Sequence, residues 1–354
     1  MRILHTYCLN YNIGDYALGM GVKNLFRQYF PVDFFGDTNL QGRVFNQYYI
    51  EEVVNKRYDL LVIGGGGIIH GRHWPNGWFW LINQDMIKSI KIPFVIFAAG
   101  NNYFKSEGDI PEKAIAHLNE TARCAKYFSV RNDGSYDRIV NVVDFNPVEQ
   151  PDPGFHIPKV DVPTVPCGED YAIVQFAADK PEARFGSSDN ILLFKRNIVK
   201  TLRAVSKDFR IVFVPHVFDD FRFSKEIADE IPHSLCVNFG EYAFDHASKI
   251  VEMYQNAKLV FAMRGHAQII PIGFGVPVIS MYNHEKHLGL MKRLGLERFG
   301  VSISDADFST SLYNIYSTVS DNYSQYIKLL SDIRVRLDMQ TSDAFKILQN
   351  RLRG

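Results

Sequence analysis

The sequence has only four cysteines, which lie far apart and form no C-x-x-C pair: Cys8, Cys124, Cys167 and Cys236. This pattern argues against a disulfide framework or a zinc knuckle, and we expect buried thiols in a reducing compartment. Long hydrophobic runs are lacking as well. Apolar runs such as Leu60–Ile63 and Phe94–Ala99 are far shorter than the roughly 18 residues of a membrane-spanning helix. The sequence therefore predicts no transmembrane segment.

An excess of charge of one sign is also missing, because Lys and Arg together number 39 and Asp and Glu together number 39. Without a net charge there is no long-range field to attract nucleic acid, which is therefore not an expected partner. The segment Met1–Cys8 is strand-like and leaves no apolar core or cleavage site of a signal peptide. We expect a globular cytoplasmic protein, either free or peripheral to the inner face of the membrane.

The hydrophobic pattern predicts an α/β protein with two Rossmann-like, doubly wound domains. Short apolar runs alternate with amphipathic stretches, which is typical of β-α units that build a parallel sheet. Strands are expected at Arg2–His5, Asp59–Ile63, Phe94–Ala98, Tyr127–Val130, Ala172–Phe176, Arg210–Val214, Leu259–Ala262 and Val278–Met281. Helices are expected at Tyr16–Tyr29, Phe45–Asn55, Leu81–Ile90, Glu112–Ala125, Ile191–Ser206, Phe221–Ile231 and Ala247–Asn256.

A proline-rich stretch divides the chain. Several prolines lie between Asn146 and Gly168, where they disfavour both a helix and a central strand. We place an N-terminal domain at 1–155, a linker at 156–168, a C-terminal domain at 169–320 and a helical tail at 321–354. Doubly wound sheets bind ligands outside the carboxyl ends of their strands, so we expect the two domains to face one cleft.

Two early segments are suited to an anion. Asn12-Ile-Gly-Asp15 opens the first helix, where backbone N–H groups favour negative charge, although Asp15 is equally suited to cap that helix. The four-glycine run that follows the second strand contains Gly65 and Gly66, which let a ligand approach the backbone closely. The alternative is a tight turn in which glycine serves packing alone. Neither G-x-G-x-x-G nor the P-loop motif is complete, so no nicotinamide or ATP site is expected.

All three tryptophans, Trp74, Trp78 and Trp80, lie within seven positions after the glycine run. In a loop at a strand end, such rings with His70 beside them suit stacking on a sugar acceptor, and the alternative is that they belong to the core. His70 and His73 have no nearby cysteine or carboxylate to complete a metal site. We therefore expect no metal and no other cofactor.

Basic residues end several of the predicted strands. Arg131 ends a strand of the first half and suits bidentate binding of phosphate or carboxylate, unless it pairs locally at the surface. His216 ends a strand of the second half and is a candidate acid or base, with capping as the alternative. Arg264 and His266 follow a later strand and would place an anion site beside a titratable group, with Lys286 further on. The alternative for His266 is a buried histidine bonded to backbone.

The order and spacing of these motifs resemble the polysaccharide pyruvyl transferase family. The resemblance runs through N-x-G-D at Asn12–Asp15, D-x-x-V-x-G-G-G-G at Asp59–Gly67, S-V-R at Ser129–Arg131, Asp152-Pro153, and R-x-H-A with G-V-P-V-I and a lysine at Arg264–Lys286. Gly265 departs from the family pattern, in which a larger apolar residue such as leucine is common. The departure at Gly265 bears on which acceptor is used more than on the reaction itself.

The resemblance implies a GT-B-like pair of domains and transfer of pyruvate from phosphoenolpyruvate to two hydroxyls of a sugar, which forms a cyclic ketal. It also implies that Asp15, Arg131, Arg264 and His266 meet the donor. On chemical grounds, the two arginines would hold the phosphate and the carboxylate of phosphoenolpyruvate, and His266 would protonate its methylene carbon. His216 or Asp15 is the candidate base.

The remaining site residues are assigned to the donor or to the acceptor. We expect Asn12, Gly65, Gly66 and Lys286 at the donor, and Trp74, Trp78, Trp80 and His70 at the acceptor. The expected partners are phosphoenolpyruvate as co-substrate and a sugar of a surface polysaccharide or its precursor, linked to a lipid or a nucleotide. A nucleotide-sugar-dependent glycosyltransferase and a non-catalytic sugar- or anion-binding protein are the alternatives.

Overall fold

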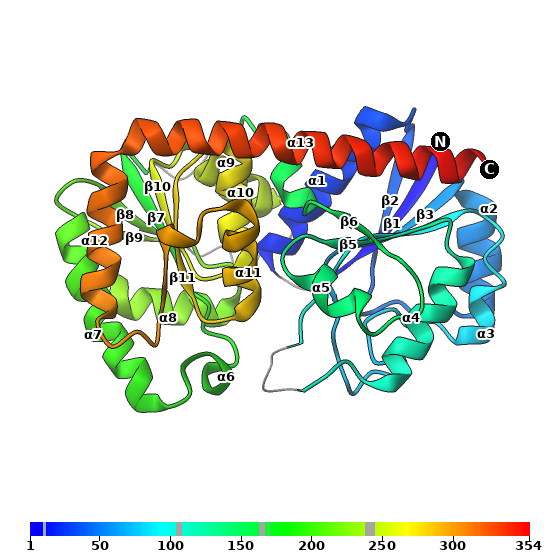
Figure 1. Cartoon of the computed structure of the whole chain (residues 1–354), viewed down its shortest axis with the longest axis horizontal. Coiled ribbons are helices and arrows are strands. Elements are labelled where there is room, and N and C mark those ends of the chain that lie inside the picture. The colour runs from blue at the N-terminus through cyan, green and yellow to red at the C-terminus, as the bar shows by residue number, and fades with distance from the viewer. Residues whose placement is uncertain (10–11, 104–107, 163–166, 169, 238–244) are drawn as a thin grey trace. The chain divides into compact units, whose positions relative to one another are not determined.

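The computed structural model describes residues 1–9, 12–103, 108–162, 167–168, 170–237 and 245–354 (Figure 1). The chain forms two compact units. Unit 1 consists of Met1–Asn10, Leu18–His156 and Arg336–Gly354, and unit 2 consists of Tyr11–Ala17 and Ile157–Val335. The boundary after His156 lies at the start of the segment predicted as a linker, of which positions 163–166 lie outside the described residues.

The C-terminal helix α13 (Tyr323–Arg353) belongs to both units, since its residues up to Val335 are part of unit 2 and the rest are part of unit 1. Within unit 1, Phe345 is completely buried and stacks on Tyr29 with ring centroids 4.2 Å apart. The separate tail expected at 321–354 therefore needs correction. The apolar face of this helix is an integral part of the core.

Unit 1 is built on a sheet of six parallel strands in the order β2-β1-β3-β4-β5-β6. They are β1 (Arg2–Tyr7), β2 (Phe34–Asn39), β3 (Leu60–Ile69), β4 (Phe94–Asn101), β5 (Tyr127–Arg131) and β6 (Val148–Gln150). The central strands are buried on both faces, which explains their continuous apolar runs. The edge strand β2 is largely accessible and lacks such a run, so the hydrophobic pattern does not predict it.

Helices cover both faces of this sheet (Figure 1). They are α1 (Ile13–Tyr29), a π-helical turn (Tyr49–Val54), α2 (Asn55–Arg57), α3 (Gln84–Ile87), α4 (Glu112–Cys124), α5 (Ser135–Val140) and a 3-10 turn (Pro153–His156). The helix expected at Phe45–Asn55 is displaced along the chain, since helical residues run from 47 to 57, and the helix expected at Leu81–Ile90 is shorter than predicted. Each begins late because an asparagine side chain caps it: Asn46 accepts from Tyr49 N (2.9 Å) and Asn83 from Asp85 N (3.3 Å).

The glycine run lies inside β3 and not in a turn after it. Gly64, Gly65 and Gly66 have φ angles of 124°, 76° and 92°, which only glycine adopts readily. A Cβ atom on Gly65 would overlap Leu18 and lie 3.2 Å from Val22 Cγ2, both on α1. The strand-to-turn expectation is therefore corrected, because these glycines let α1 pack directly against the backbone of β3.

Unit 2 repeats the architecture with a second sheet of six parallel strands in the order β12-β11-β10-β7-β8-β9. They are β7 (Tyr171–Gln175), β8 (Arg210–Phe213), β9 (Leu235–Cys236), β10 (Leu259–Ala262), β11 (Val278–Tyr282) and β12 (Gly300–Ser302). The chain moves outward from β7 through β9, then returns to place β10 on the other side of β7. The strand order thus reverses between β7 and β10, the position at which such sheets bind ligands.

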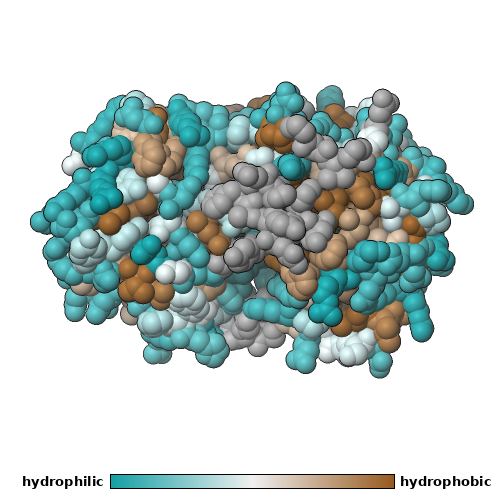
Figure 2. All heavy atoms as spheres, turned by 180° about the vertical axis from the view of Figure 1, so that it is seen from behind, coloured by the Kyte–Doolittle hydropathy of each residue, from teal (hydrophilic) through white to brown (hydrophobic). Residues whose placement is uncertain are grey.

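The helices of unit 2 are α6 (Pro181–Phe185), α7 (Ser188–Val205), α8 (Phe218–Ala228), α9 (Asp245–Asn256), α10 (Gly265–Phe274), α11 (Glu285–Leu294), a 3-10 turn (Glu297–Phe299) and α12 (Phe308–Asp321). On the molecular face drawn in Figure 2, hydrophilic residues predominate and hydrophobic ones form separate patches. Among the described residues, no helix combines the length and the apolar character needed to cross a membrane.

A buried histidine in β1 makes the stability of unit 1 sensitive to acid. His5 is completely buried, stacks on Tyr7, and its Nε2 lies 2.9 Å from Gly64 O. Burial lowers the pKa of His5 to about 4 from its usual 6.5. As the pH falls, the unfolded chain takes up the proton first, so stability present above about pH 6.5 is lost as the pH approaches 4.

We therefore expect the free energy of unfolding to fall by up to about 1.4 kcal/mol per pH unit through His5 alone. His5→Gln keeps a donor for Gly64 O but has no titratable group, so it should remove this part of the slope. Urea titrations at pH 7.5, 6.0 and 5.0 measure how the free energy of unfolding changes with pH. The control is His73→Gln, which makes the same substitution at an exposed histidine. Equal slopes for wild type and His5→Gln would show that His5 does not carry the effect.

Candidate active site

A cluster of charged side chains in unit 2 lies where the strand order of its sheet reverses. Arg264 directly precedes α10 and follows β10, and the segment Ala177–Lys180 follows β7. The amide of Arg264 donates to Gln175 Oε1 at 2.9 Å, which ties the two strand ends together. This position agrees with the general rule for ligand sites in doubly wound sheets.

Asp220 of α8 holds this cluster together. Its side chain is fully buried and, within the described part of unit 2, accepts six hydrogen bonds. Two come from Arg264, through Nε at 2.6 Å and Nη2 at 2.7 Å. Three backbone amides also donate to it, those of Ala178, His216 and Val217. The buried carboxylate thus fixes both the guanidinium of Arg264 and the loops after β7 and β8.

A second carboxylate, Asp179, joins Arg264 to another arginine. Its Oδ1 accepts from Nη2 of Arg264 and, at 3.0 Å, from Nη2 of Arg184 in α6. Burial alone would raise the pKa of Asp179, but the two cations outweigh burial and lower it to about 2. Burial would likewise lower the pKa of Arg264, yet Asp220 and Asp179 raise it above its usual value. Asp179 and Arg264 are therefore both charged at neutral pH.

The start of α1 lies against His266 of α10. A Cβ atom on Gly14 would lie 2.7 Å from the His266 Cβ and closer still to its ring, so only glycine fits there. Asn12 Oδ1 accepts from Gly14 N (3.0 Å), which makes Asn12 the cap of α1 and leaves Asp15 in its first turn. The structure therefore brings N-x-G-D and R-x-H together. Tyr11, the preceding residue of the predicted loop, lies outside the described residues, as does Asn10.

His216 is a neighbour of this cluster but is fully buried. Its Nε2 lies 2.9 Å from the Tyr254 hydroxyl, and its carbonyl accepts from Ile13 N at 3.1 Å. Burial, with the Arg264 charge, lowers the pKa of His216 well below its usual value. The predicted role as a base in contact with substrate is corrected, because the side chain has no exposed surface. His216 instead positions the start of α1.

Lys286 lies in the first turn of α11, after the strand β11. Its amide donates to Nδ1 of the helix cap, His284, at 3.2 Å. The next residue, His287, is buried, and burial together with the Lys286 charge lowers its pKa well below the usual value. A Cβ atom on Gly265 would lie 3.9 Å from the His287 ring, so the N-terminus of α10 and the first turn of α11 are neighbours.

Arg131 belongs to a different cluster, inside unit 1. It is 3% exposed and forms ion pairs with Asp133 (2.8 Å) and Asp152 (2.7 Å). Its guanidinium lies against Gly100, where a Cβ atom would come within 2.5 Å of Nε. Two motifs of the chain, S-V-R and D-P, thus meet in one buried network. The donor role of Arg131 stays a prediction. The structure adds that its guanidinium is already paired with two carboxylates.

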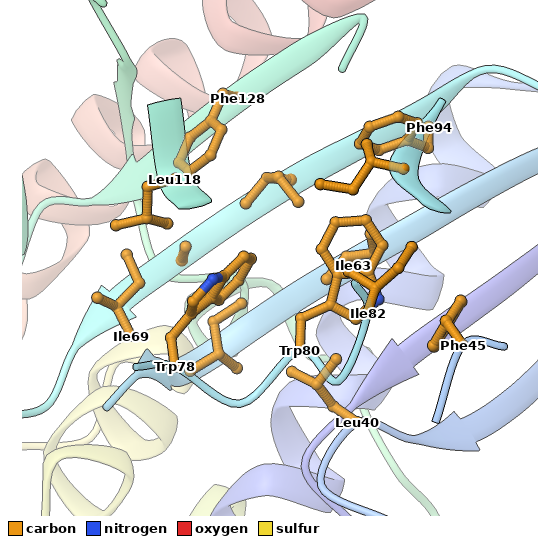
Figure 3. Close-up of a cluster of buried hydrophobic side chains, with 14 of the residues drawn as sticks. Leu40, Phe45, Ile63, Ile69, Trp78, Trp80, Ile82, Phe94, Leu118 and Phe128 are labelled. Atoms are coloured by element: carbon orange, nitrogen blue, oxygen red, sulfur yellow. The ribbon is translucent and has the colours of Figure 1, made fainter. Parts of the chain in front are cut away.

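The aromatic segment is mostly core. Trp78 and Trp80 are completely buried among apolar residues of unit 1 (Figure 3), and Trp78 Nε1 donates to His117 Nδ1 at 2.9 Å. Their predicted stacking on a sugar is corrected, because neither ring has exposed surface. Trp74 and His70 are only partly buried and remain candidates for the acceptor. Gly65 is buried beneath α1 and Gly66 is buried as well, which leaves their donor role without support from the geometry.

Sequence reasoning missed Asp179 and Arg184 and gave Asp220 no role. Asp220 was detectable as an acidic residue directly before a predicted helix, four positions after His216. Asp179 lies three positions after a predicted strand, which is the one sequence signal that points to it. Nothing in the local sequence pairs Arg184 with Arg264, because they lie 80 positions apart.

Whole-chain similarity to solved structures supports the GT-B fold. UDP-GlcNAc 2-epimerase from Neisseria meningitidis, bound to UDP-GlcNAc, matches with 11% identity, 99% of each chain covered and a TM-score of 0.55. The Methanocaldococcus jannaschii UDP-GlcNAc 2-epimerase matches with 12% identity, 90% of this chain and 92% of the other covered, and a TM-score of 0.54. A spinosyn rhamnosyltransferase matches with 9% identity, coverage of 96% and 97%, and a TM-score of 0.52. At these identities the likeness shows the fold alone.

Sequence comparison identifies the family. No curated protein matches the chain significantly. The family model described as polysaccharide pyruvyl transferase matches residues 12–285, which is more than half of the chain. This range begins at the cap of α1 and ends at the start of α11, so it includes Arg264 and His266 together with the loop that contacts them. The chain belongs to the polysaccharide pyruvyl transferase family.

Proposed function

We propose that the protein transfers pyruvate from phosphoenolpyruvate to two hydroxyls of a sugar in a surface polysaccharide or its precursor. The products are a cyclic ketal and inorganic phosphate. The proposal rests above all on the contact between Gly14 and His266, next to Arg264. These residues come from both ends of the range that the family model matches.

The chemistry of phosphoenolpyruvate suits these groups. Arg264 binds an anionic group of the donor, and His266 gives a proton to the methylene carbon, so that C2 becomes oxocarbenium-like. One sugar hydroxyl attacks C2, the C2–O bond to phosphate breaks, and the second hydroxyl closes the ring. Of the two hydroxyl protons, one in net balance ends on the methyl group and the other on phosphate.

Other predicted residues are assigned to the base, the donor or the acceptor. Asp15 is the proposed base, because it lies in the first turn of α1, next to Gly14, while His216 is buried. Lys286, in the first turn of α11, adds positive charge for the donor. Trp74 and His70 are proposed for the acceptor, as the only members of the predicted acceptor set with accessible surface in the described structure.

Phosphate release tests the reaction class. The protein is incubated with phosphoenolpyruvate and a panel of lipid-linked and nucleotide-linked sugars, and both inorganic phosphate and the mass of the sugar are followed. We expect phosphate only when donor and acceptor are both present, with a matching mass gain on one acceptor. Consumption of a nucleotide sugar while phosphoenolpyruvate stays intact would favour a glycosyltransferase instead.

Gly14→Ala tests the contact that carries the proposal. The new methyl group must displace His266, so we expect kcat to fall about tenfold, which corresponds to roughly 1.4 kcal/mol in the barrier. Gly42→Ala is the control, because the atom nearest to a Cβ added at Gly42 is the side-chain amide nitrogen of Asn39, at 3.3 Å. Unchanged kcat in Gly14→Ala, measured on a protein of wild-type thermal stability, would show that the position of His266 does not matter.

A further inference from the structure

We infer that the phosphate group of the donor binds between Arg184 and Arg264 by displacing the carboxylate of Asp179. This inference rests on the proposed function, because it assumes a donor that carries phosphate. It assigns Arg184 to the donor site and gives Asp179 the role of an internal competitor. Neither residue is part of any motif that pointed to the function.

The geometry of the two arginines favours a phosphate between them. Their Nη2 atoms bond the same carboxylate oxygen, Oδ1 of Asp179, so two guanidinium groups converge on one anionic position. Guanidinium groups bind phosphate oxygens in a fixed, often bidentate geometry, and a phosphate offers more oxygens and more charge than a carboxylate. The position that Asp179 occupies is therefore suited to phosphate.

Asp179 and Asp220 differ in how firmly they are held. The Asp220 side chain is 0% exposed and binds three backbone amides as well as Arg264, whereas the Asp179 side chain is 32% exposed. Of these two carboxylates, Asp179 is thus the one that can leave. Lys180, which follows it, has a φ of 54°, a conformation uncommon for a residue other than glycine, so the turn that carries Asp179 is not in its most favoured form.

Both arginines would stay in place after Asp179 leaves. Arg264 keeps its two bonds to Asp220, at 2.6 and 2.7 Å. Arg184 keeps a bond from Nε to the backbone carbonyl of Asp179 at 2.7 Å and one from Nη1 to Asn283 Oδ1 at 3.3 Å. The two cations are therefore preorganised, and an incoming phosphate has only to replace one side chain.

Opposite effects on affinity test the inference. In calorimetric titrations at fixed ionic strength, Asp179→Asn should bind inorganic phosphate and phosphoenolpyruvate about three- to tenfold more tightly than wild type. Arg184→Ala should bind both about tenfold more weakly. A merely structural role predicts weaker binding in both variants, so tighter binding in Asp179→Asn separates the two explanations. Weaker or unchanged binding in Asp179→Asn would overturn the inference.

Two exposed residues of the same unit serve as controls for net charge. Glu226→Gln and Arg203→Ala change the charge by the same amounts as the two test variants but lie on exposed ion pairs, so binding should stay at the wild-type level. Pyruvate, which has a carboxylate and no phosphate, is titrated in parallel. Tighter binding of pyruvate but not of phosphate in Asp179→Asn would overturn the assignment to phosphate.

The outcome also separates this inference from the proposed function. If wild type binds inorganic phosphate with the expected changes in the variants, yet no acceptor yields phosphate from phosphoenolpyruvate, the anion site stands and the proposed reaction fails. If phosphate is released in the assay but Asp179→Asn and Arg184→Ala bind donor like wild type, the reaction stands and the site lies elsewhere. Absence of binding by wild type to either anion overturns the inference.

Discussion

His266→Gln is expected to lower kcat by about 10²-fold or more while donor binding stays nearly normal, because general acid catalysis contributes at least that much. Glutamine has similar hydrogen-bonding capacity but cannot transfer a proton as an imidazolium does. The start of α1 packs against the His266 ring at Gly14. The measurement combines steady-state kinetics of phosphate release with calorimetric titration of phosphoenolpyruvate.

The matched control is His73→Gln, which makes the same substitution at an exposed histidine of unit 1. It should leave kcat and donor affinity unchanged. Near-full turnover in His266→Gln would show that another group supplies the proton. Loss of donor binding together with kcat would instead make His266 a binding residue.

Asp220→Asn is expected to lower the free energy of unfolding by about 3 to 5 kcal/mol, the usual consequence of removing one partner of a buried ion pair. The variant leaves the Arg264 guanidinium without its fully buried counterion. It also replaces one carboxylate oxygen by an amide N–H₂ group, which faces a donor in either orientation, because the Ala178 amide donates to Oδ1 and the His216 amide to Oδ2. Urea denaturation measures the change.

Glu226→Gln on the same helix, α8, is the control for this prediction. Glu226 pairs with Lys195 at the surface, with 61% of its side chain exposed, and exposed pairs contribute only about 0 to 1 kcal/mol. A difference of less than about 1 kcal/mol between the two variants would mean that Asp220 does not hold the loops of this site together.

Several elements of the fold are predictable because the local sequence contains their cause. Leu259–Ala262 is a strand exactly as predicted, since an apolar run of that length in a β-α pattern has few other interpretations. The same reasoning does not predict β2, because this edge strand is largely accessible and has no continuous apolar run. It also overestimates the helix at Leu81–Ile90, where Asn83 delays the start of α3.

The candidate site is predictable in part. Arg264 and His266 follow a predicted strand, and the structure places them at the reversal of strand order in unit 2. The carboxylates that bind Arg264 are not predictable in this way, because Asp220 and Asp179 lie 44 and 85 positions away from it in the sequence. Only the strand order brings those carboxylates to the guanidinium, and it cannot be read from the residues around Arg264.

Local patterns predict the two β-α halves, the boundary near residue 156 and the family motifs, because each depends on neighbouring residues and on hydrophobic periodicity. Which of the motif residues are accessible depends on the packing of the folded chain. This packing buried Trp78 and Trp80 in a core, placed Gly65 beneath α1, and matched Arg131 with two carboxylates. Burial and charge pairing arise between segments that are far apart in the chain, so local sequence patterns do not predict them.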